Sequence, residues 1–184
     1  MKDEGGRMKD GVPEGWERVP LGEVMTLQRG HDLPSQDRVE GDVPIVSSSG
    51  ITGFHDKKKA DAPGVVTGRY GTLGQVYYID RDYWPLNTAL YVTDIKGSPP
   101  LFILHLLKHA LESIQSDKAA IPGLNRNVVH SMNVLRPPAA LRAAFGDFAA
   151  DLYRQISILT AQTQKLRTAR DLLLPRLMSG EIEV

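Results

Sequence analysis

The pattern of apolar and polar positions changes along the chain. In the first part, short apolar runs alternate with Gly, Pro and charged residues, which predicts strands and turns. From Pro138 to Pro175, apolar residues instead recur every seven positions, in a stretch with only Gly146 as a helix-weakening residue. A sustained seven-residue repeat is typical of a helix that pairs with another helix in a coiled coil. The sequence therefore predicts a β-containing domain followed by one long helix.

Several short segments of the first part have the features of strands. Residues 65–67 and 75–79 flank a Gly-rich turn and predict a hairpin. Further strands are expected at 44–46, 87–92 and 132–135, with a strand or helical turn at 21–27. A helix is expected from Ser98 to about residue 117, and a short helical turn at 127–131. The predicted fold class is α+β: a small, mainly antiparallel, curved sheet with packed helices, then the long C-terminal helix.

The domain boundaries follow from these elements. Residues 1–14 are charged and rich in Gly, and are expected to form a disordered tail. Residues 15–138 form the predicted globular domain. Residues 139–184 form the predicted long helix and a C-terminal tail.

The long helix has a seam of apolar side chains that is interrupted in its middle. The predicted dimer interface comprises Phe145, Phe148, Leu152, Leu159, Leu166 and Leu173. Gln155 and Gln162 occupy companion positions near the centre, and polar seam residues fix the register of a coiled coil at a cost in stability. We expect two copies to pair through antiparallel helices. The alternative is a long helix that packs on its own domain.

Composition restricts the possible functions. The chain has 184 residues and no cysteine, which excludes disulfides, thiolate metal sites and cysteine nucleophiles. The apolar run 101–107 is too short to cross a membrane, and the N-terminus is not a signal peptide, so a cytoplasmic protein without a membrane partner is expected. Lys+Arg and Asp+Glu both number 22, so any surface for nucleic acid must be a local patch.

The sequence contains no convincing catalytic or metal-binding motif. His105 and His109 have the i, i+4 spacing of a metal pair, but the Glu of the metalloprotease motif is absent between them. The glycines at 68, 71 and 74 lack the Gly-Lys-Ser/Thr ending of a phosphate loop and precede a strand. We expect neither catalysis nor a metal or cofactor in this chain.

Cationic, aromatic and amide side chains in loops and turns are the remaining candidates for binding. Such groups suit DNA, because arginine reads guanine, asparagine reads adenine, and lysine contacts phosphates. The predicted DNA-binding residues are Arg29, His55, Lys57, Lys58, Lys59, Arg69, Tyr70, Lys118, Asn125 and Arg126. The alternative for the three consecutive lysines is an ordinary solvated edge.

Four groups of residues carry a resemblance to a known family. Residues 65–76 (VVTGRYGTLGQV) and 84–92 (WPLNTALYV) resemble the core of a target recognition domain, and 121–126 (IPGLNR) with 134–138 (VLRPP) resemble its exit. Residues 166–182 (LRTARDLLLPRLMSGEI) resemble the end of a spacer helix, and the opening Gly15-Trp16-Glu17 with 21–24 also fits. Over about residues 13 to 184, the chain is similar to the DNA specificity subunit of type I restriction-modification systems.

The resemblance implies a mechanism without catalysis in this chain. One recognition domain reads half of a bipartite site on double-stranded DNA, and paired helices set the distance between the halves. The methylation subunit would bring S-adenosylmethionine, and the restriction or motor subunit would bring ATP and Mg. The alternative from another class is a non-enzymatic coiled-coil protein that binds protein rather than DNA.

The chain departs from the family pattern in one respect. The family's usual subunit has two recognition domains and two spacer helices, whereas this sequence has one of each. The sequence is either a half-size subunit that pairs with itself or a fragment of a longer gene. The apparently complete tail and the possible start at Met8 favour the half-size subunit.

Overall fold

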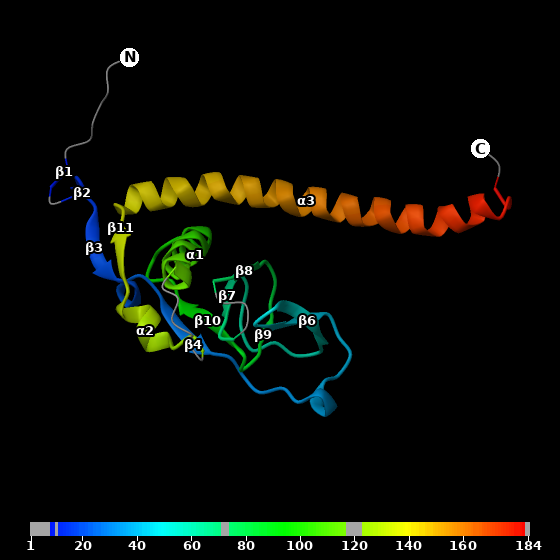
Figure 1. Ribbon diagram of the computed structural model, residues 1–184, viewed down its shortest axis with the longest axis horizontal. Helices are drawn as coiled ribbons and strands as arrows, with labels where there is room; N and C mark the ends of the chain where they lie inside the picture. Colours follow the sequence, from blue (N-terminus) through cyan, green and yellow to red (C-terminus); the bar gives the residue numbers. More distant parts are fainter. Residues whose placement is uncertain (1–7, 10, 71–73, 117–122, 183–184) are drawn as a thin grey trace, which may run out of the picture. The chain divides into compact units, whose positions relative to one another are not determined.

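The computed structural model describes residues 8–9, 11–70, 74–116 and 123–182 (Figure 1). Two compact units are distinguished, Met1–Gly146 and Asp147–Val184. The helices are α1 (Pro100–Ser116), α2 (Arg126–Ser131) and α3 (Ala139–Met178), with two short 3₁₀ helices, η1 (Leu21–Glu23) and η2 (Ser35–Asp37). The strands are β1 (Met8–Lys9), β2 (Val12–Pro13), β3 (Glu17–Pro20), β4 (Thr26–Arg29), β5 (Val43–Ser47), β6 (Gly50–His55), β7 (Gly64–Gly68), β8 (Val76–Ile79), β9 (Trp84–Pro85), β10 (Ala89–Asp94) and β11 (Asn133–Arg136).

The described strands form several small sheets rather than one. The largest has the order β4–β10–β7–β8 and is antiparallel throughout. A three-stranded sheet has the order β6–β5–β9, and only its β5–β9 pair is parallel. Strands β11 and β3 form an antiparallel pair. The α+β class with mainly antiparallel strands and a long C-terminal helix is confirmed.

Helix α1 packs against β7 and β8 of the four-stranded sheet (Figure 1). Its residues Ile103, Leu107, Ala110 and Leu111 are buried, as their helical spacing predicts. On the sheet, Val66 and Ala89 pack with Tyr83 in a buried cluster. The buried face of α1 thus covers part of this sheet.

The predicted hairpin is the pair β7–β8. Val66 lies opposite Tyr77 and Thr67 opposite Val76, so residues separated by the Gly-rich turn are directly paired. Gly74 has a φ of +86°, which is favourable for glycine and strained for other residues. The glycine in this turn therefore serves the backbone conformation, as expected from the sequence.

Two predictions about the ends of the first unit need correction. Residues 8–13 were expected in a disordered tail, but β1 and β2 pair there as a small hairpin. Gly11, with a φ of +74°, lies between these two strands. The charged, Gly-rich composition of this segment gave no signal of the strands. At the other end, α3 begins at Ala139, whereas the first compact unit extends to Gly146. The first turns of α3 belong to that unit because Phe145 contacts Phe102 and His105.

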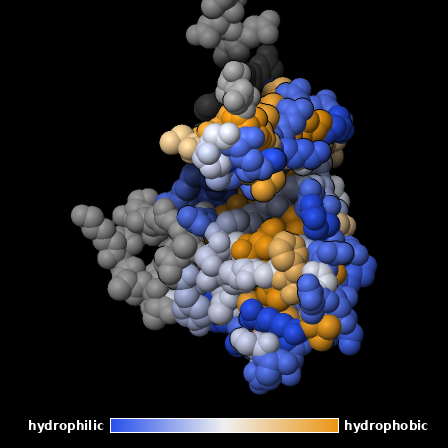
Figure 2. Space-filling view, turned by 90° about the vertical axis from the view of Figure 1, so that its right-hand side faces the viewer, coloured by the Kyte–Doolittle hydropathy of each residue, from blue (hydrophilic) through white to orange (hydrophobic). Residues whose placement is uncertain are grey.

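The second part of α3 exposes many large apolar side chains. Phe148, Leu159 and Leu166 have exposed fractions of 64%, 60% and 71%. Figure 2 shows hydrophobic residues on the surface of this helix. No helix in the described part of the chain is long and apolar enough to cross a membrane. Within one chain, Phe148, Leu152, Leu159 and Leu166 of the predicted seam are thus exposed.

Helix α2 is attached to the edge strand β4 by a histidine. The Nε2 atom of His130 accepts a hydrogen bond from the N–H of Leu27 at 2.9 Å. A Cβ added at Gly22 would lie 3.2 Å from the Cβ of His130, so η1 also packs closely on this residue. Burial, and to a smaller extent the charge of Arg126, lowers the pKa of His130. The fold therefore favours the neutral ring as acceptor.

We expect stability to fall at mildly acidic pH because of His130. The unfolded chain takes up a proton near the ordinary histidine pKa of about 6.5, whereas the folded chain resists it. The contribution is therefore fully present above about pH 6.5 and decreases as the pH falls from there towards the lowered folded pKa. Urea midpoints at pH 8 and pH 5 should differ less for His130→Gln than for the native chain. An equal difference in both proteins would show that His130 does not cause it.

Candidate nucleic-acid interface

A polar hollow in the first unit is lined by residues from four parts of the chain. It has a volume of about 520 Å³ and is bounded by the end of β4, the segment after β7, the start of β10 and the start of α2. Five of the ten side chains predicted to bind DNA line it, namely Arg29, Arg69, Tyr70, Asn125 and Arg126. Residues far apart in the sequence are therefore brought to one surface.

Two arginines in the hollow share one main-chain acceptor. The Nε of Arg29 and the Nη1 of Arg69 each donate to the carbonyl oxygen of Asn87 at 3.2 Å. Each guanidinium has five N–H donors, so the remaining donors are left for other acceptors. Two fixed positive charges beside each other, with donors to spare, suit an anionic or acceptor-rich ligand such as a phosphate or a guanine edge.

The backbone at Arg69 is also held from two sides. Its N–H donates to the carbonyl of Thr88 at 3.0 Å, and its carbonyl accepts from the N–H of Leu124 at 2.8 Å. The second bond connects the segment after β7 to the segment before α2. Arg69 is therefore both a lining residue and part of the framework of the hollow.

Tyr70 covers part of the same surface. The Arg69 guanidinium lies 5.1 Å from the centroid of the Tyr70 ring, in a cation–π arrangement. A Cβ at Gly123 would lie 2.6 Å from a carbon of this ring, so a larger residue there would displace the ring. Tyr70 is 47% exposed, which leaves ring surface for stacking on a base or sugar.

Asn125 and Arg126 differ in their availability. The Asn125 side-chain oxygen accepts from the N–H of Asn127 at 2.9 Å and caps α2. The cap occupies the oxygen that bidentate recognition of adenine would use, so a structural role for Asn125 competes with the predicted contact. Arg126 is exposed and has no hydrogen bond or ion pair with the described residues.

The three consecutive lysines lie outside this hollow, after β6, and have different partners. Lys58 Nζ lies 2.7 Å from Asp61 and 2.6 Å from Asp82, and these two hydrogen bonds raise the pKa of Lys58. Lys59 Nζ lies 5.2 Å from the centroid of the Trp84 ring. In the described part of the chain, Lys57 has no ion pair. Among the described residues, Lys57 and Lys59 thus have no carboxylate partner, and only Lys59 has a ring contact.

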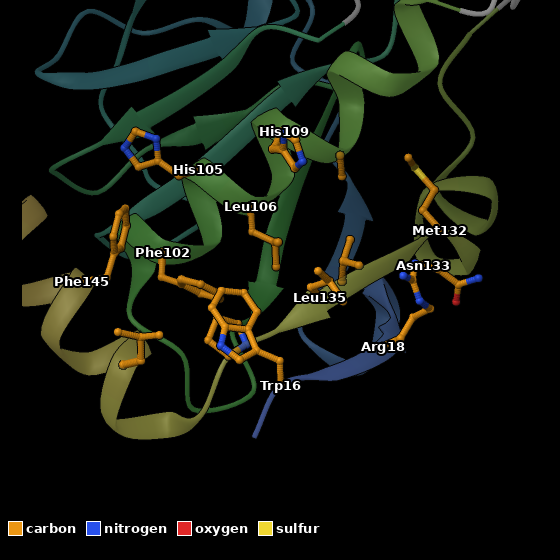
Figure 3. Close-up of a pocket in the computed structure, with 14 residues that line it drawn as sticks. Trp16, Arg18, Phe102, His105, Leu106, His109, Met132, Asn133, Leu135 and Phe145 are labelled. Carbon is orange, nitrogen blue, oxygen red and sulfur yellow. The ribbon is translucent and has the colours of Figure 1, made fainter. Parts of the chain in front are cut away.

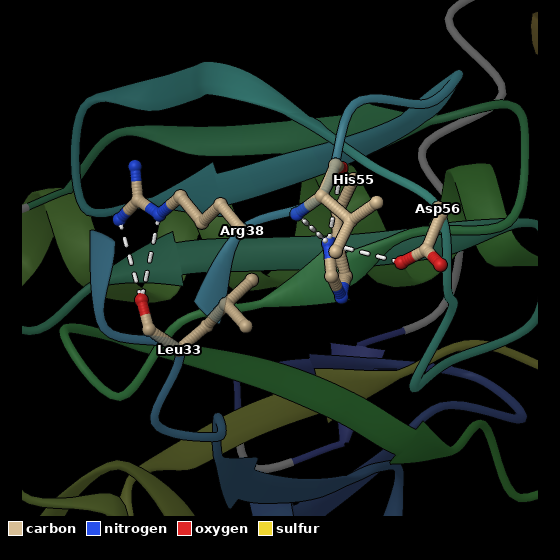
Figure 4. A network of polar contacts seen from close by, with 5 residues as sticks. Leu33, Arg38, His55 and Asp56 are labelled. Carbon is tan, nitrogen blue, oxygen red and sulfur yellow. Dashed lines mark hydrogen bonds and ion pairs between the residues drawn. The ribbon is translucent and has the colours of Figure 1, made fainter. Parts of the chain in front are cut away.

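The prediction that His55 faces DNA is wrong, because its side chain is buried, with 4% of the residue exposed. Its Nδ1 lies 3.1 Å from the backbone nitrogen of Val39 and 3.2 Å from a carboxylate oxygen of Asp56. Its ring also meets Trp84 edge-on, with 5.1 Å between centroids. In the same network, Arg38 donates to the carbonyl of Leu33 (Figure 4). His55 therefore anchors the loop before β5.

Two residues remain, Lys118 from the predicted set and Asn87 from outside it. Lys118, which was predicted to bind DNA, lies outside the described residues. Asn87 was not predicted, although it holds both arginines and its side-chain amide donates to Asp32. A main-chain acceptor has no sequence signal of its own. Only the position of Asn87 within the 84–92 motif could have indicated its role.

The described part of the chain contains no cluster of histidine and carboxylate residues that could hold a metal ion. His105 and His109 are both exposed on α1. Partial desolvation of the exposed His105 ring, followed by the charge of Lys108, lowers the pKa of His105. The lining of the hollow provides cations, an aromatic ring and hydrogen-bond donors, which can bind a ligand.

Solved structures with a similar fold come from type I restriction-modification systems. The S subunit from M. genitalium matches with a TM-score of 0.71 and 19% identity, over 89% of this chain and 46% of that one. The HsdS subunit from Thermoanaerobacter tengcongensis matches with a TM-score of 0.59 and 15% identity, over 97% and 48%. A chain from a study of complex assembly and conformational transition of the type I system matches with a TM-score of 0.61 and 15% identity, over 94% and 46%.

The present chain spans less than half the length of these three chains. Among curated proteins, no sequence matches it. The family model described as "Type I restriction modification DNA specificity domain" matches residues 13–168, which is most of the chain. The protein therefore belongs to the type I restriction-modification DNA specificity domain family.

Proposed function

We propose that this chain is a DNA-binding specificity module that recognises one half of a bipartite site. The observation that carries the proposal is the pair Arg29 and Arg69, whose guanidinium groups are fixed on one carbonyl at the mouth of a polar hollow. Preoriented guanidiniums lose little side-chain freedom on binding and match guanine or phosphate acceptors. Membership of a DNA specificity family supports the same ligand.

The residues of the hollow divide into two proposed roles. Arg69, whose guanidinium and backbone are both held, reads a base edge, because base readout requires a fixed donor geometry. Arg126, which is exposed, contacts a phosphate, as does Lys57 outside the hollow. Tyr70 adds a stacking surface.

Chemistry on DNA would then depend on other subunits. We propose that a methylation subunit with S-adenosylmethionine and a restriction or motor subunit with ATP and Mg act at the site that this chain selects. The family assignment supports this division, as does a related chain from a type I assembly. The chain's own part is to bind and orient the DNA.

A single recognition domain reads a short sequence, so a second domain is needed for a bipartite site. We propose that a second copy supplies it through antiparallel pairing of α3, with Gln155 and Gln162 near the centre of the seam. The exposed positions Leu152, Leu159 and Leu166 support this pairing, because burial removes apolar surface from water. Two-fold symmetry then requires a palindromic target with an unspecified middle.

The competing function is a coiled-coil protein that binds another protein. The exposed apolar face of α3 is the observation that favours it. Salt dependence separates the two functions, because contacts with phosphates release counterions and make the affinity for duplex DNA fall steeply with salt. The proposal is tested by measuring duplex binding at two salt concentrations. The methylated sites are then mapped in the presence of the methylation subunit.

Arg69 and Arg126 are expected to respond differently to substitution. Arg69→Ala should cost roughly 1–3 kcal/mol at one base position, because it removes a readout group. Arg126→Ala should weaken binding to all sequences alike and reduce the salt slope by about one. The matched control is Arg81→Ala, which removes an exposed arginine that pairs with Asp80. Fluorescence anisotropy with a panel of duplexes gives both quantities; unchanged binding in both variants would exclude the hollow as the DNA site.

Lys57 and Lys58 form a second matched pair. Lys57→Ala should reduce the salt slope by about one, because its charge is available to a phosphate. Lys58→Ala should reduce it by less, because Asp61 and Asp82 already act as its counterions. The slope of log affinity against log salt concentration is the measurement. A larger effect for Lys58 would contradict the assignment.

The helix pair is tested by charges introduced into the seam. Burial of Leu159 and Leu166 should contribute roughly 1.5–3 kcal/mol per side chain, so Leu159→Asp with Leu166→Asp should yield monomers. Light scattering measures the mass, and near-ultraviolet circular dichroism checks that the first unit keeps its fold. A native chain that is monomeric at tens of micromolar, or a non-palindromic methylated site, would refute self-pairing.

A further inference from the structure

Two hollows of the first unit differ in the chemistry of their walls. One has a volume of about 680 Å³, and its walls come from β3, β11, α1 and the first turns of α3, with large apolar side chains such as Trp16, Phe102 and Phe145 (Figure 3). Base edges in DNA are recognised mainly through hydrogen bonds, which a mainly apolar wall supplies poorly. Groups that distinguish base pairs are therefore expected at the polar hollow, where Arg29 and Arg69 are held.

Asn87 holds an acidic side chain as well as the two arginines. Its carbonyl oxygen accepts from Nε of Arg29 and Nη1 of Arg69, both at 3.2 Å. Its side-chain amide donates to Oδ1 of Asp32. One residue therefore orients two guanidinium groups and one carboxylate.

The main chain explains why Asp32 lies beside Asn87. His31 and Leu86 form a parallel bridge, in which the N–H of His31 donates to Pro85 at 2.8 Å and the N–H of Asn87 donates to His31 at 3.0 Å. The residues that follow such a bridge are neighbours, so the side chains of Asp32 and Asn87 meet. The carboxylate is thus held through its side chain and through the adjoining backbone, and has little freedom to lose on binding.

The bonds to Asn87 leave hydrogen-bonding groups of Arg29 and Asp32 unused. Arg29 is held by Nε, so Nη1 and Nη2, which form an end-on fork, have no hydrogen bond with the described residues. Asp32 is held by Oδ1, and its Oδ2 likewise has no partner among them. In the same part of the chain, no ion pair joins Asp32 to Arg29 or Arg69, and Asp32 and Arg29 are both exposed. The pair therefore presents two donors and a separate acceptor to solvent.

Two donors followed by an acceptor are the complement of one base-pair edge. In the major groove, a G·C pair presents the acceptors N7 and O6 of guanine, followed by the N4 donor of cytosine. An arginine fork needs two adjacent acceptors, which only guanine provides, and a carboxylate only accepts. An A·T edge alternates acceptor and donor, and so does not fit. Because a carboxylate repels phosphates, the place of Asp32 beside the arginines favours contact with a base over contact with the DNA backbone.

We propose that Arg29 and Asp32 together read a single G·C base pair. Arg29 donates to guanine, and Asp32 accepts from the N4 amino group of the paired cytosine. The inference rests on the proposed DNA-binding function, to which it adds a specificity-determining carboxylate and the base pair that the carboxylate selects. Asn87 sets the spacing between the fork and the carboxylate, because it binds both.

Selection from a library of duplexes with a randomised stretch gives the base preference of each protein. The native chain should select a G·C pair at one position, and Arg29→Ala and Asp32→Asn should each reduce the preference at that same pair about tenfold. Asparagine at position 32 keeps an oxygen for Asn87 but presents a donor in place of the second oxygen, so it retains the loop and removes the reading group. Asp37→Asn, which removes an exposed charge from the same loop, is the matched control and should leave the preference unchanged.

A base analogue tests the cytosine contact directly. At the selected pair, cytosine is replaced by 2-pyrimidinone, which lacks the 4-amino group. Fluorescence anisotropy should show a loss of affinity that is about tenfold larger for the native chain than for Asp32→Asn, because the variant has no carboxylate to be deprived of its donor. Asp37→Asn should lose as much as the native chain, and near-ultraviolet circular dichroism checks that each variant is folded.

The possible results separate this inference from the function on which it rests. Equal losses with the analogue for the native chain and Asp32→Asn overturn the reading by Asp32, while DNA binding stands. So does relaxation by the Arg29 and Asp32 variants at different base pairs, or an Asp32→Asn variant that only weakens binding to every duplex alike, as loss of loop order would. A native chain without salt-dependent affinity for duplex DNA overturns the proposed function, and the G·C inference with it.

Discussion

The polar hollow of the first unit depends on a close approach between two backbone segments, residues 29–31 and residues 85–89. At Gly30 the approach leaves no space for a side chain, because a Cβ would lie 2.2 Å from the carbonyl oxygen of Leu86. The N–H of Gly30 donates to Ala89 at 3.1 Å, and the N–H of His31 donates to Pro85 at 2.8 Å. These bonds keep Arg29 beside the carbonyl of Asn87, where Arg69 also binds.

The same junction connects the two larger sheets of the first unit. The N–H of Leu86 donates to Val46 on β5 at 2.8 Å, while the Gly30 bond reaches β10. Leu86 also packs with Leu33, Ile45 and Trp84 in a buried cluster. The packing that joins the sheets therefore fixes the position of the hollow, and with it the positions of Arg29 and Arg69.

The sequence predicted the elements with strong local signals. The seven-residue repeat indicated α3, and the paired β-rich segments around glycines indicated the β7–β8 hairpin. It did not predict that His55 is buried. Strand β6 exposes Ile51 and Phe54, so its sequence lacks the alternation of a half-buried strand. Asn87 was missed for another reason: its carbonyl does the binding, and main-chain atoms are the same in every residue. The sequence thus indicated which polar side chains loops and turns carry, five of which line the hollow, whereas burial and main-chain contacts required the fold.

The junction at Gly30 has a consequence for how such a protein can change over generations. The bonds that hold residues 29–31 and 85–89 together involve main-chain atoms, so they do not depend on which side chains line the hollow. Substitutions at positions 70 and 126 alter the groups offered to a ligand while these bonds remain. Gly30, in contrast, leaves room for the carbonyl groups of Pro85 and Leu86 and cannot vary in the same way. Point substitution at the rim of the hollow can therefore change the groups that it offers to a ligand, while the main-chain bonds at Gly30 stay the same.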